Sequence, residues 1–178
     1  MAEAPPTTGN PNAKLVNRPT FLENKNSRFL IMDAPTDANL SAYMEVMNKK
    51  NVKIVVRACE GTYSTAPLVK TGIKVVELAF PDGDPPPDDV VTKWLELVKE
   101  EFSKPEQTTI AVHCVAGLGR APVLVAIALI EMGMDPMDAV AFIRKRRRGA
   151  INARQLKYIE SYKRHSGAHV GGCGCIVS

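Results

Sequence analysis

Short apolar runs alternate along this chain with segments that carry apolar residues at every third or fourth position. The runs are rich in β-branched residues and almost uninterrupted, as expected of strands buried on both faces. They cover residues 28–32, 53–58, 73–80 and 108–114. A further run over 16–21 is expected to pair with 28–32 across a turn at 24–26.

Helical spacing predicts the elements between and after these strands. A first helix is expected to begin at Thr36 or Asp37, either of which can cap it. A second helix follows Pro87. Three more are expected over about 121–133, 135–147 and 152–164. Asp135 and Pro136 suit the N-cap and the first position of the middle one.

The alternation of strands and helices predicts an α/β fold, with a mostly parallel central sheet flanked by helices. All of these elements lie within residues 15–165, which we expect to form one domain because no linker or repeat interrupts them. Residues 1–14 are rich in Pro, Thr and Asn and predict a disordered arm. The glycine-rich residues 166–178 predict a flexible tail.

The composition narrows the classes of protein. Of the 178 residues, 45% are hydrophobic and 24% charged, which excludes collagen, coiled coils and wholesale disorder. The net charge of +4 suits an anionic substrate or a membrane surface but is too small to indicate nucleic acid. Four cysteines are too few for a disulfide scaffold. We expect neither a membrane-spanning helix nor a signal peptide, because no apolar run is long enough.

The strongest chemistry lies where the strand over 108–114 ends at Cys114. A loop with two glycines leads from it to Arg120, which opens an apolar helix. Such a loop can turn successive N–H groups toward an anion, and the helix N-terminus adds its dipole. The guanidinium of Arg120 matches two phosphate oxygens, and a thiol over these dipoles is expected to ionise at neutral pH. We therefore predict a phosphate loop, residues 114–120, with Cys114 as nucleophile. Its phosphate-binding residues would be Val115, Ala116, Gly117, Leu118, Gly119 and Arg120.

Phosphoryl transfer to a thiolate also needs an acid, because a phenolate leaving group must be protonated. The acid loop, residues 79–85, follows the strand over 73–80 and contains Asp82 and Asp84. Spacing leaves both carboxylates open, and a Pro-Asp-Gly sequence also favours a plain turn.

Residues 113–122, HCVAGLGRAP, resemble the signature of cysteine-based protein tyrosine phosphatases. With VRACEGTY at 56–63 and FIRKRRRGA at 142–150, the chain is similar to the phosphatases of regenerating liver. This prenylated, dual-specificity-like family is also called protein tyrosine phosphatase type IVA. The resemblance implies the fold predicted above and a cysteine-dependent protein-tyrosine phosphatase with no metal or organic cofactor. Its substrates would be phosphoproteins or phosphoinositides.

The resemblance also implies roles for single residues. Cys114 would attack phosphorus, Arg120 would hold the phosphoryl oxygens, and Asp82 would be the general acid. Ala121 stands where most tyrosine phosphatases have a Ser or Thr that helps expel the thiolate, which predicts slow turnover. Gln155 is expected either to orient the attacking water or to lie on the surface of its helix.

Cys59 closes the strand over 53–58 at the same edge of the sheet as Cys114. Two thiols at neighbouring strand ends can approach disulfide range, although a free cysteine is often a small buried hydrophobe. The resemblance implies a reversible Cys59–Cys114 disulfide that protects the nucleophile from oxidation. Arg57 and Glu60 beside it either support the phosphate loop or lie exposed. His113 is expected to orient the loop rather than act as a base.

The last four residues, CIVS, form a C-a-a-X box that predicts prenylation of Cys175, with farnesyl favoured by the final Ser. Cys173 is a candidate for a second lipid. We expect the protein on the cytoplasmic side of plasma or endosomal membranes, and in the cytoplasm when unprenylated. The basic run 144–148 either faces the bilayer, forms a solvated helix end or serves as a nuclear-localisation signal.

A binding module is the alternative function. The resembled family binds cyclin M type magnesium transporters, whose acidic loop side chain occupies the phosphate site. Slow turnover would suit such a partner. The sequence leaves open the physiological substrate and whether the chain forms a homo-oligomer, and it implies no nucleic-acid partner.

Overall fold

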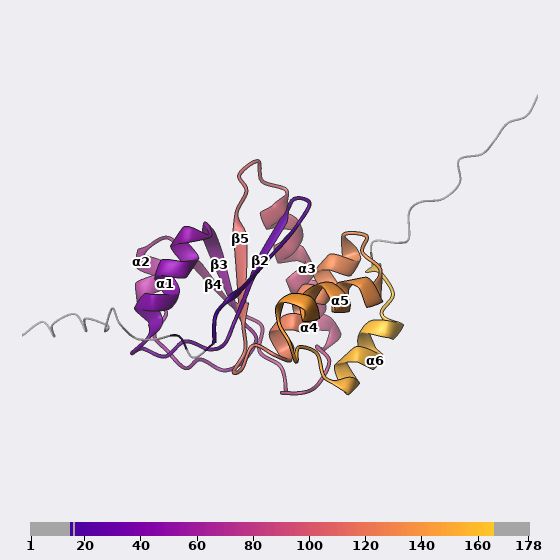
Figure 1. Ribbon diagram of the computed structural model, residues 1–178. Coiled ribbons are helices and arrows are strands. Elements are labelled where there is room, and N and C mark those ends of the chain that lie inside the picture. Colours follow the sequence, from indigo (N-terminus) through magenta and orange to yellow (C-terminus); the bar gives the residue numbers. More distant parts are fainter. Residues whose placement is uncertain (1–14, 16, 166–178) are drawn as a thin grey trace, which may run out of the picture.

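A five-stranded sheet runs through the middle of the molecule, in the order β1-β2-β5-β3-β4 (Figure 1). Its strands are β1 (Thr20–Asn24), β2 (Ser27–Met32), β3 (Val52–Arg57), β4 (Lys74–Glu77) and β5 (Thr109–His113). Four of them are parallel, and β1 pairs with β2 in antiparallel fashion. This computed structural model describes residue 15 and residues 17–165. It confirms the predicted α/β fold with a mostly parallel sheet.

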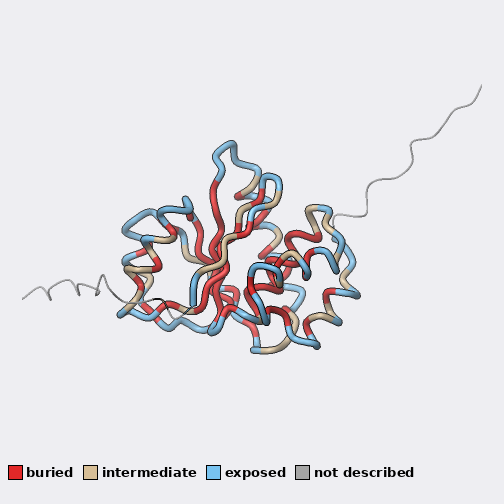
Figure 2. The backbone as a smooth tube through the Cα atoms, in the orientation of Figure 1, coloured by how far each residue is buried: buried red, intermediate tan, exposed pale blue. Residues whose placement is uncertain are grey.

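Helices cover both faces of the sheet (Figure 1). On one face lie α1 (Leu40–Lys49) and α2 (Ala66–Lys70). On the other lie α3 (Asp88–Phe102), α4 (Arg120–Glu131), α5 (Pro136–Arg146) and α6 (Ala153–Ser161). Two buried apolar clusters result, one on each face of the sheet. The backbone of the central strands runs largely through buried residues (red in Figure 2). None of the helices in the described ranges is long and apolar enough to span a membrane.

The middle strand β5 and helix α4 are the most deeply buried elements of the fold. Every residue of β5 is buried, and so is every residue of α4 from Arg120 to Ile130. This follows from their sequences, because neither carries a charge between its ends. The junction of the two elements, residues 114–119, is therefore fixed at both ends by the core.

Two predicted elements have different bounds in the structure. The hairpin forms, but its first strand begins at Thr20, and the turn lies at Lys25, which has a φ of 50°. The strand expected over 73–80 ends at Glu77. The last backbone hydrogen bond to the neighbouring strand runs from Leu78 N to Arg57 O (2.9 Å), and beyond it the chain leaves the sheet and enters the acid loop.

The prediction that Thr36 or Asp37 caps the first helix was wrong. The helix begins after Asn39, and Asp37 Oδ1 instead accepts a hydrogen bond from Ser64 N at 2.8 Å. Asp135 does cap α5, accepting from Met137 N and Asp138 N, as predicted. Helix α2 was missed because five residues are too short to show a helical period. The expected arm at 1–14 and the tail at 166–178, with Cys173 and Cys175, lie outside the described residues.

Candidate active site

The predicted phosphate loop lies at the carboxyl edge of the sheet, between β5 and α4. Cys114 is 2% exposed and Arg120 is 7% exposed, so both functional side chains sit within the fold. Val115 and Leu118, by contrast, point outward with 59% and 39% of their surface exposed. The positive end of the twelve-residue α4 lies beside the thiol.

Four consecutive carbonyl groups of the phosphate loop are bound from outside. Val115 O accepts from Ala34 N at 3.0 Å, and Leu118 O accepts from Ile151 N at 2.7 Å. Between them, one arginine donates to both remaining carbonyls: Arg147 Nη2 to Ala116 O (3.1 Å) and Arg147 Nε to Gly117 O (2.6 Å).

These outward carbonyls determine where the loop amides point. In a trans peptide the C=O and the following N–H point in opposite directions. Fixing the carbonyls of residues 115–118 outward therefore aims the N–H groups of residues 116–119 toward the inside of the loop. The result is a preformed concave row of donors that suits a tetrahedral anion.

Gly117 is required by this packing as well as by its backbone angle. Its φ is 65°, and a Cβ at this position would lie 2.3 Å from Met32 O and 2.5 Å from Arg147 Nη2. No side chain fits there, because the loop backbone passes directly against β2 and the arginine.

Ile151 also shows that the loop conformation is imposed by its surroundings. It is buried and has a φ of 67°, a left-handed angle that β-branched residues rarely adopt. Such strain costs about 1–3 kcal/mol and persists only where neighbouring structure fixes it. Its amide hydrogen bond to Leu118 O ties the strained residue to the phosphate loop.

The basic run 144–148 divides into buried and exposed side chains. Arg147 is 6% exposed and also donates to Thr20 Oγ1 and Arg18 O, and Arg144 donates to Ala150 O and Ile151 O. Nothing in the sequence indicates the role of Arg147, since its neighbours have the same charge. Lys145, Arg146 and Arg148 are exposed.

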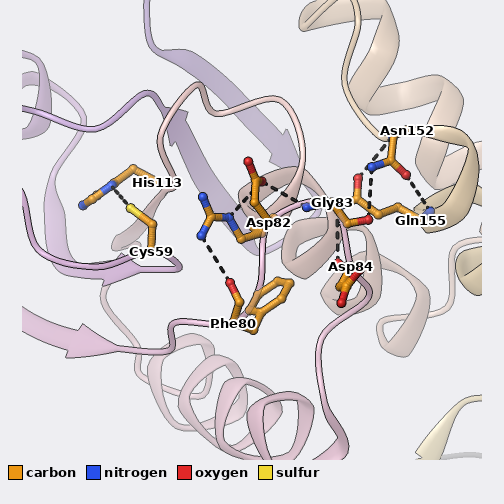
Figure 3. Close-up of polar contacts among 9 residues, drawn as sticks. Cys59, Phe80, Asp82, Gly83, Asp84, His113, Asn152 and Gln155 are labelled. Carbon is orange, nitrogen blue, oxygen red and sulfur yellow. Dashed lines mark hydrogen bonds and ion pairs between the residues drawn. The ribbon is translucent and has the colours of Figure 1, made fainter.

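The acid loop reaches Arg120 through Asp82. Asp82 Oδ1 lies 3.2 Å from Arg120 Nε, and Arg120 Nη1 donates to Phe80 O at 3.2 Å (Figure 3). Arg120 Nε is buried and, although it faces the carboxylate, makes no hydrogen bond. Asp84 is instead paired with Arg154. The structure therefore brings Asp82, and not Asp84, to the phosphate loop.

Gln155 is fully buried, so the prediction of a surface position was wrong. It completes a capping box at the start of α6, in which Asn152 Oδ1 accepts from Gln155 N (2.8 Å) and Gln155 Oε1 accepts from Asn152 N (3.2 Å). Its Nε2 also donates to Asp84 O at 3.3 Å, and Asn152 Nδ2 donates to Gly83 O at 3.1 Å (Figure 3). The start of α6 thus joins the acid loop to the phosphate loop.

Cys59 and Cys114 are both buried free thiols at the ends of neighbouring strands. The β3–β5 register pairs Arg57 with His113, and Ala58 N donates to His113 O at 2.8 Å, so the two cysteines follow at the same edge. Burial, together with the nearby Cys114 thiol, raises the pKa of Cys59 above its usual range despite the opposing charge of Arg120.

His113 faces Cys59 and Tyr63. Its Nδ1 lies 4.0 Å from Cys59 Sγ, and its Nε2 lies 2.9 Å from Tyr63 Oη. Burial, with the nearby Arg57 charge, lowers the pKa of His113 to about 4, so the imidazole is neutral at physiological pH. Arg57 contacts Tyr63 and Glu77 but not the phosphate loop, whereas Glu60 is exposed.

Comparisons with known proteins agree with this geometry. A family profile described as "Polymorphic toxin system, DSP-PTPase phosphatase" matches residues 31–134. Protein tyrosine phosphatase type IVA 3 of Homo sapiens is 55% identical over 150 residues, which are 83% of this chain and 87% of that protein. The PRL-1 phosphatase of Drosophila melanogaster is 48% identical over 160 residues, 87% and 91% of the two chains. The chain belongs to the protein tyrosine phosphatase type IVA family.

Solved structures of other phosphatases have the same fold as this type IVA phosphatase. A protein tyrosine phosphatase from Leishmania major superposes with a TM-score of 0.76 at 39% identity, covering 83% of this chain and all of that one. The chain is accordingly a hydrolase, a cysteine-dependent protein tyrosine phosphatase that acts on phosphoproteins.

A hollow of about 300 Å³ opens between the acid loop and the phosphate loop of this type IVA phosphatase. Its lining combines polar groups with one apolar side chain: Asp82, Gly83, Leu118, Gly119, Gly149 and Asn152. The hollow therefore adjoins the exposed carboxylate of Asp82, which faces Arg120, and Gly119, the last residue of the phosphate loop before α4.

Proposed function

We propose that this type IVA phosphatase hydrolyses phosphoprotein monoesters, phosphotyrosine among them, through a phosphocysteine on Cys114. One observation carries the proposal: four consecutive carbonyl groups of the phosphate loop accept hydrogen bonds on its outer side. The amide groups that follow them therefore point inward, where they and the Arg120 guanidinium can bind the phosphoryl group. Such preorganised donors stabilise the charge of the transition state without reorganisation.

The reaction proceeds in two displacements. The Cys114 thiolate attacks phosphorus while the bond to the leaving oxygen breaks, and Asp82 gives that oxygen its proton. Water then attacks the phosphocysteine, its proton passes to the Asp82 carboxylate, and the thiolate leaves with inorganic phosphate as the second product. In the structure the Asp82 carboxylate lies at Arg120 and is largely exposed, with 75% of its side chain accessible, which suits a group that must meet both substrate and water.

Slow turnover is part of the proposal. Ala121 follows Arg120 in the first turn of α4 and is fully buried, so no hydroxyl group stands at this position to stabilise the departing thiolate. We expect the second displacement to limit the rate. An Ala121→Ser substitution adds such a hydroxyl and should shorten the lifetime of the phosphoenzyme.

A reversible Cys59–Cys114 disulfide is the proposed redox control. Peroxide would oxidise the Cys114 thiolate to a sulfenic acid, and Cys59 would displace its hydroxyl group to give the disulfide and water. The raised pKa of Cys59 means that its reactive thiolate becomes more abundant as the pH rises, so disulfide formation should accelerate with pH.

Prenylation of Cys175 is the proposed route to the membrane, on the cytoplasmic side of plasma or endosomal membranes. The exposed Lys145, Arg146 and Arg148 would add attraction to anionic lipids, since one lipid chain alone binds only marginally. Without the lipid, the protein is expected in the cytoplasm.

Hydrolysis of an aryl phosphate under reducing conditions tests the catalytic proposal. Wild-type protein should release phosphate, and Cys114→Ser should not. Cys59→Ser, which lacks only the redox partner, should retain activity, but after peroxide treatment it should recover less activity on addition of reductant than wild type does. Turnover by Cys114→Ser would overturn the assignment of the nucleophile.

A second candidate function is capture of a protein partner in the phosphate site. The contact between the Asp82 carboxylate and Arg120 favours it, because it places a carboxylate, rather than a phosphate, against the guanidinium. An acidic loop of a magnesium-transporter-type partner would use the same contact. Such binding should persist in Cys114→Ser and be lost in Arg120→Met, whereas loss in neither variant would exclude this site.

A further inference from the structure

A second hollow, of about 510 Å³, lies between α3 and α4 at the opposite end of α4 from the phosphate loop. Its apolar lining consists of Leu95 and Val98 from α3, Ala128 from α4, and Met132 just after it. The other lining residues are Thr92, Glu96, Lys99, Glu131 and His165. An apolar hollow of this size is in the range that binds organic ligands rather than ions.

The chain after α6 is directed to this hollow by hydrogen bonds. Tyr162 Oη and His165 N both donate to Glu131 Oε1, at 2.8 and 2.7 Å. Arg164 Nη2 donates to Met134 O at 3.2 Å. These bonds hold residues 162–165 across the end of α4, and His165 itself lines the hollow. The part of the chain that the structure describes therefore ends beside the hollow.

We propose that this hollow, the tail pocket, receives the lipid attached to Cys175 of the same chain. The inference rests on the prenylation proposed above. Cys175 is the tenth residue after His165, and an extended segment of that length reaches about 33 Å, far more than a return to the pocket requires. The segment between them contains four glycines, at 167, 171, 172 and 174, which place little steric restriction on a reversal of the chain.

The chemistry of the pocket fits this occupant better than a peptide. An isoprenoid is apolar throughout and needs no hydrogen-bond partner, and the surface that lines the pocket is predominantly apolar. While the tail pocket holds the lipid, the lipid cannot insert into a bilayer, and the protein remains in solution. Since a single lipid chain binds a bilayer only marginally, the pocket and the membrane would compete for it on comparable terms.

The test measures binding of a dansyl-labelled Gly-Cys(S-farnesyl) methyl ester to full-length Cys175→Ser protein, which carries no lipid of its own. We expect saturable binding with one site per chain. Leu95→Gln and Met132→Gln should each weaken it about fivefold or more, because they place an amide on the apolar floor. Met137→Gln is the matched control: Met137 is 45% exposed on α5, outside the pocket, and should leave binding unchanged. Phosphatase activity reports that every variant is folded.

A second arm separates this inference from the proposed prenylation. The wild-type chain is treated with farnesyltransferase, its intact mass is measured, and its binding to anionic vesicles is compared with that of the lipidated Leu95→Gln chain. The variant should partition about fivefold more strongly to vesicles, because the competing site is weakened.

If no lipid is added, the prenylation proposal fails and this inference with it. If the lipid is added but the probe shows no saturable binding, or binds all variants equally, the tail pocket alone is overturned. A change of oligomeric state in the pocket variants without an effect on the probe would assign the hollow to a second copy of the chain and likewise overturn it.

Discussion

The phosphate loop and the acid loop meet at Arg120 but are held in opposite ways. The phosphate loop is bound on its outer side at four consecutive carbonyls, by Ala34 just after β2, by Arg147 and by Ile151 in the turn before α6. In the acid loop, residues 81–85 are exposed or half-buried, and the polar contacts from the rest of the molecule reach Phe80, Asp82, Gly83 and Asp84.

This difference matches what each loop must do. The donors for the phosphoryl group have to be in position before the reaction, since rearranging them would add to the barrier. The acid has to approach the leaving group and later the water, so a loop with few buried contacts serves it better. The predictions below test each side of this comparison.

The largest effect is expected from Asp82→Asn, which removes the acid without changing its shape. With a phenyl ester, whose leaving group needs a proton, kcat/KM, which reports the first displacement, should fall about 10³-fold. With a dinitrophenyl ester, which leaves without a proton, it should fall much less. Asp84→Asn is the matched control and should change either rate by less than about threefold. A larger loss in Asp84→Asn than in Asp82→Asn would reverse the assignment.

The free energy of unfolding should depend strongly on pH, because of His113, the residue directly before the phosphate loop. Its pKa is about 4 in the folded protein, mainly because of burial, against about 6.5 in an unfolded chain. Between these values only the unfolded chain binds the proton, so stability is lost as the pH falls from about 6.5 to about 4, by about 3 kcal/mol in all. Urea unfolding across this range should show the slope in wild type and in His165→Gln, and a flatter slope in His113→Gln. Equal slopes in all three would contradict the buried neutral imidazole.

Arg147→Met should lower kcat/KM about 30-fold, because two of the four outward carbonyls lose their donor and the amides that follow them are no longer fixed. Arg147→Lys should recover part of this loss, since an ammonium can still donate to one carbonyl. The neighbouring Arg148 is exposed, and Arg148→Met should leave kcat/KM unchanged. Inhibition by vanadate, which binds as a phosphate analogue, should weaken in parallel with kcat/KM. Unaltered vanadate binding in Arg147→Met would mean that the arginine stabilises the fold without ordering the loop.

The smallest effect is expected from Arg154→Met, which releases Asp84 from its partner on the acid loop. The pair is largely exposed and contributes little to stability. We expect less than about a threefold change in kcat and no change in vanadate binding. A tenfold loss would show that the acid loop, too, must be held rigidly.

The sequence alone predicted the parts of the fold that depend on local patterns. The buried strands, the amphipathic helices and the Asp135 cap follow from apolar spacing and from the chemistry of single residues. The strand–loop–helix around Cys114 was predictable for the same reason, because its nucleophile, glycines and arginine are adjacent in the chain.

The rest depended on contacts between distant segments. Arg147 reaches the phosphate loop from 30 residues away, and within the basic run nothing distinguishes it from its neighbours. Asp82 and Asp84 could not be separated by spacing, since the difference lies in which arginine each one meets. The burial of Gln155 likewise follows from the packing of α6 against the acid loop, which no helical period reveals.

The most direct test of the account is the phosphoenzyme itself. The protein is mixed with an aryl phosphate under reducing conditions, quenched in acid at successive times, and analysed by intact-mass spectrometry with peptide mapping. We predict one added phosphoryl group, located on Cys114, that accumulates in wild type, persists longer than in Ala121→Ser and is absent from Cys114→Ser. Phosphate release without any adduct on Cys114, or an adduct on another residue, would contradict the account.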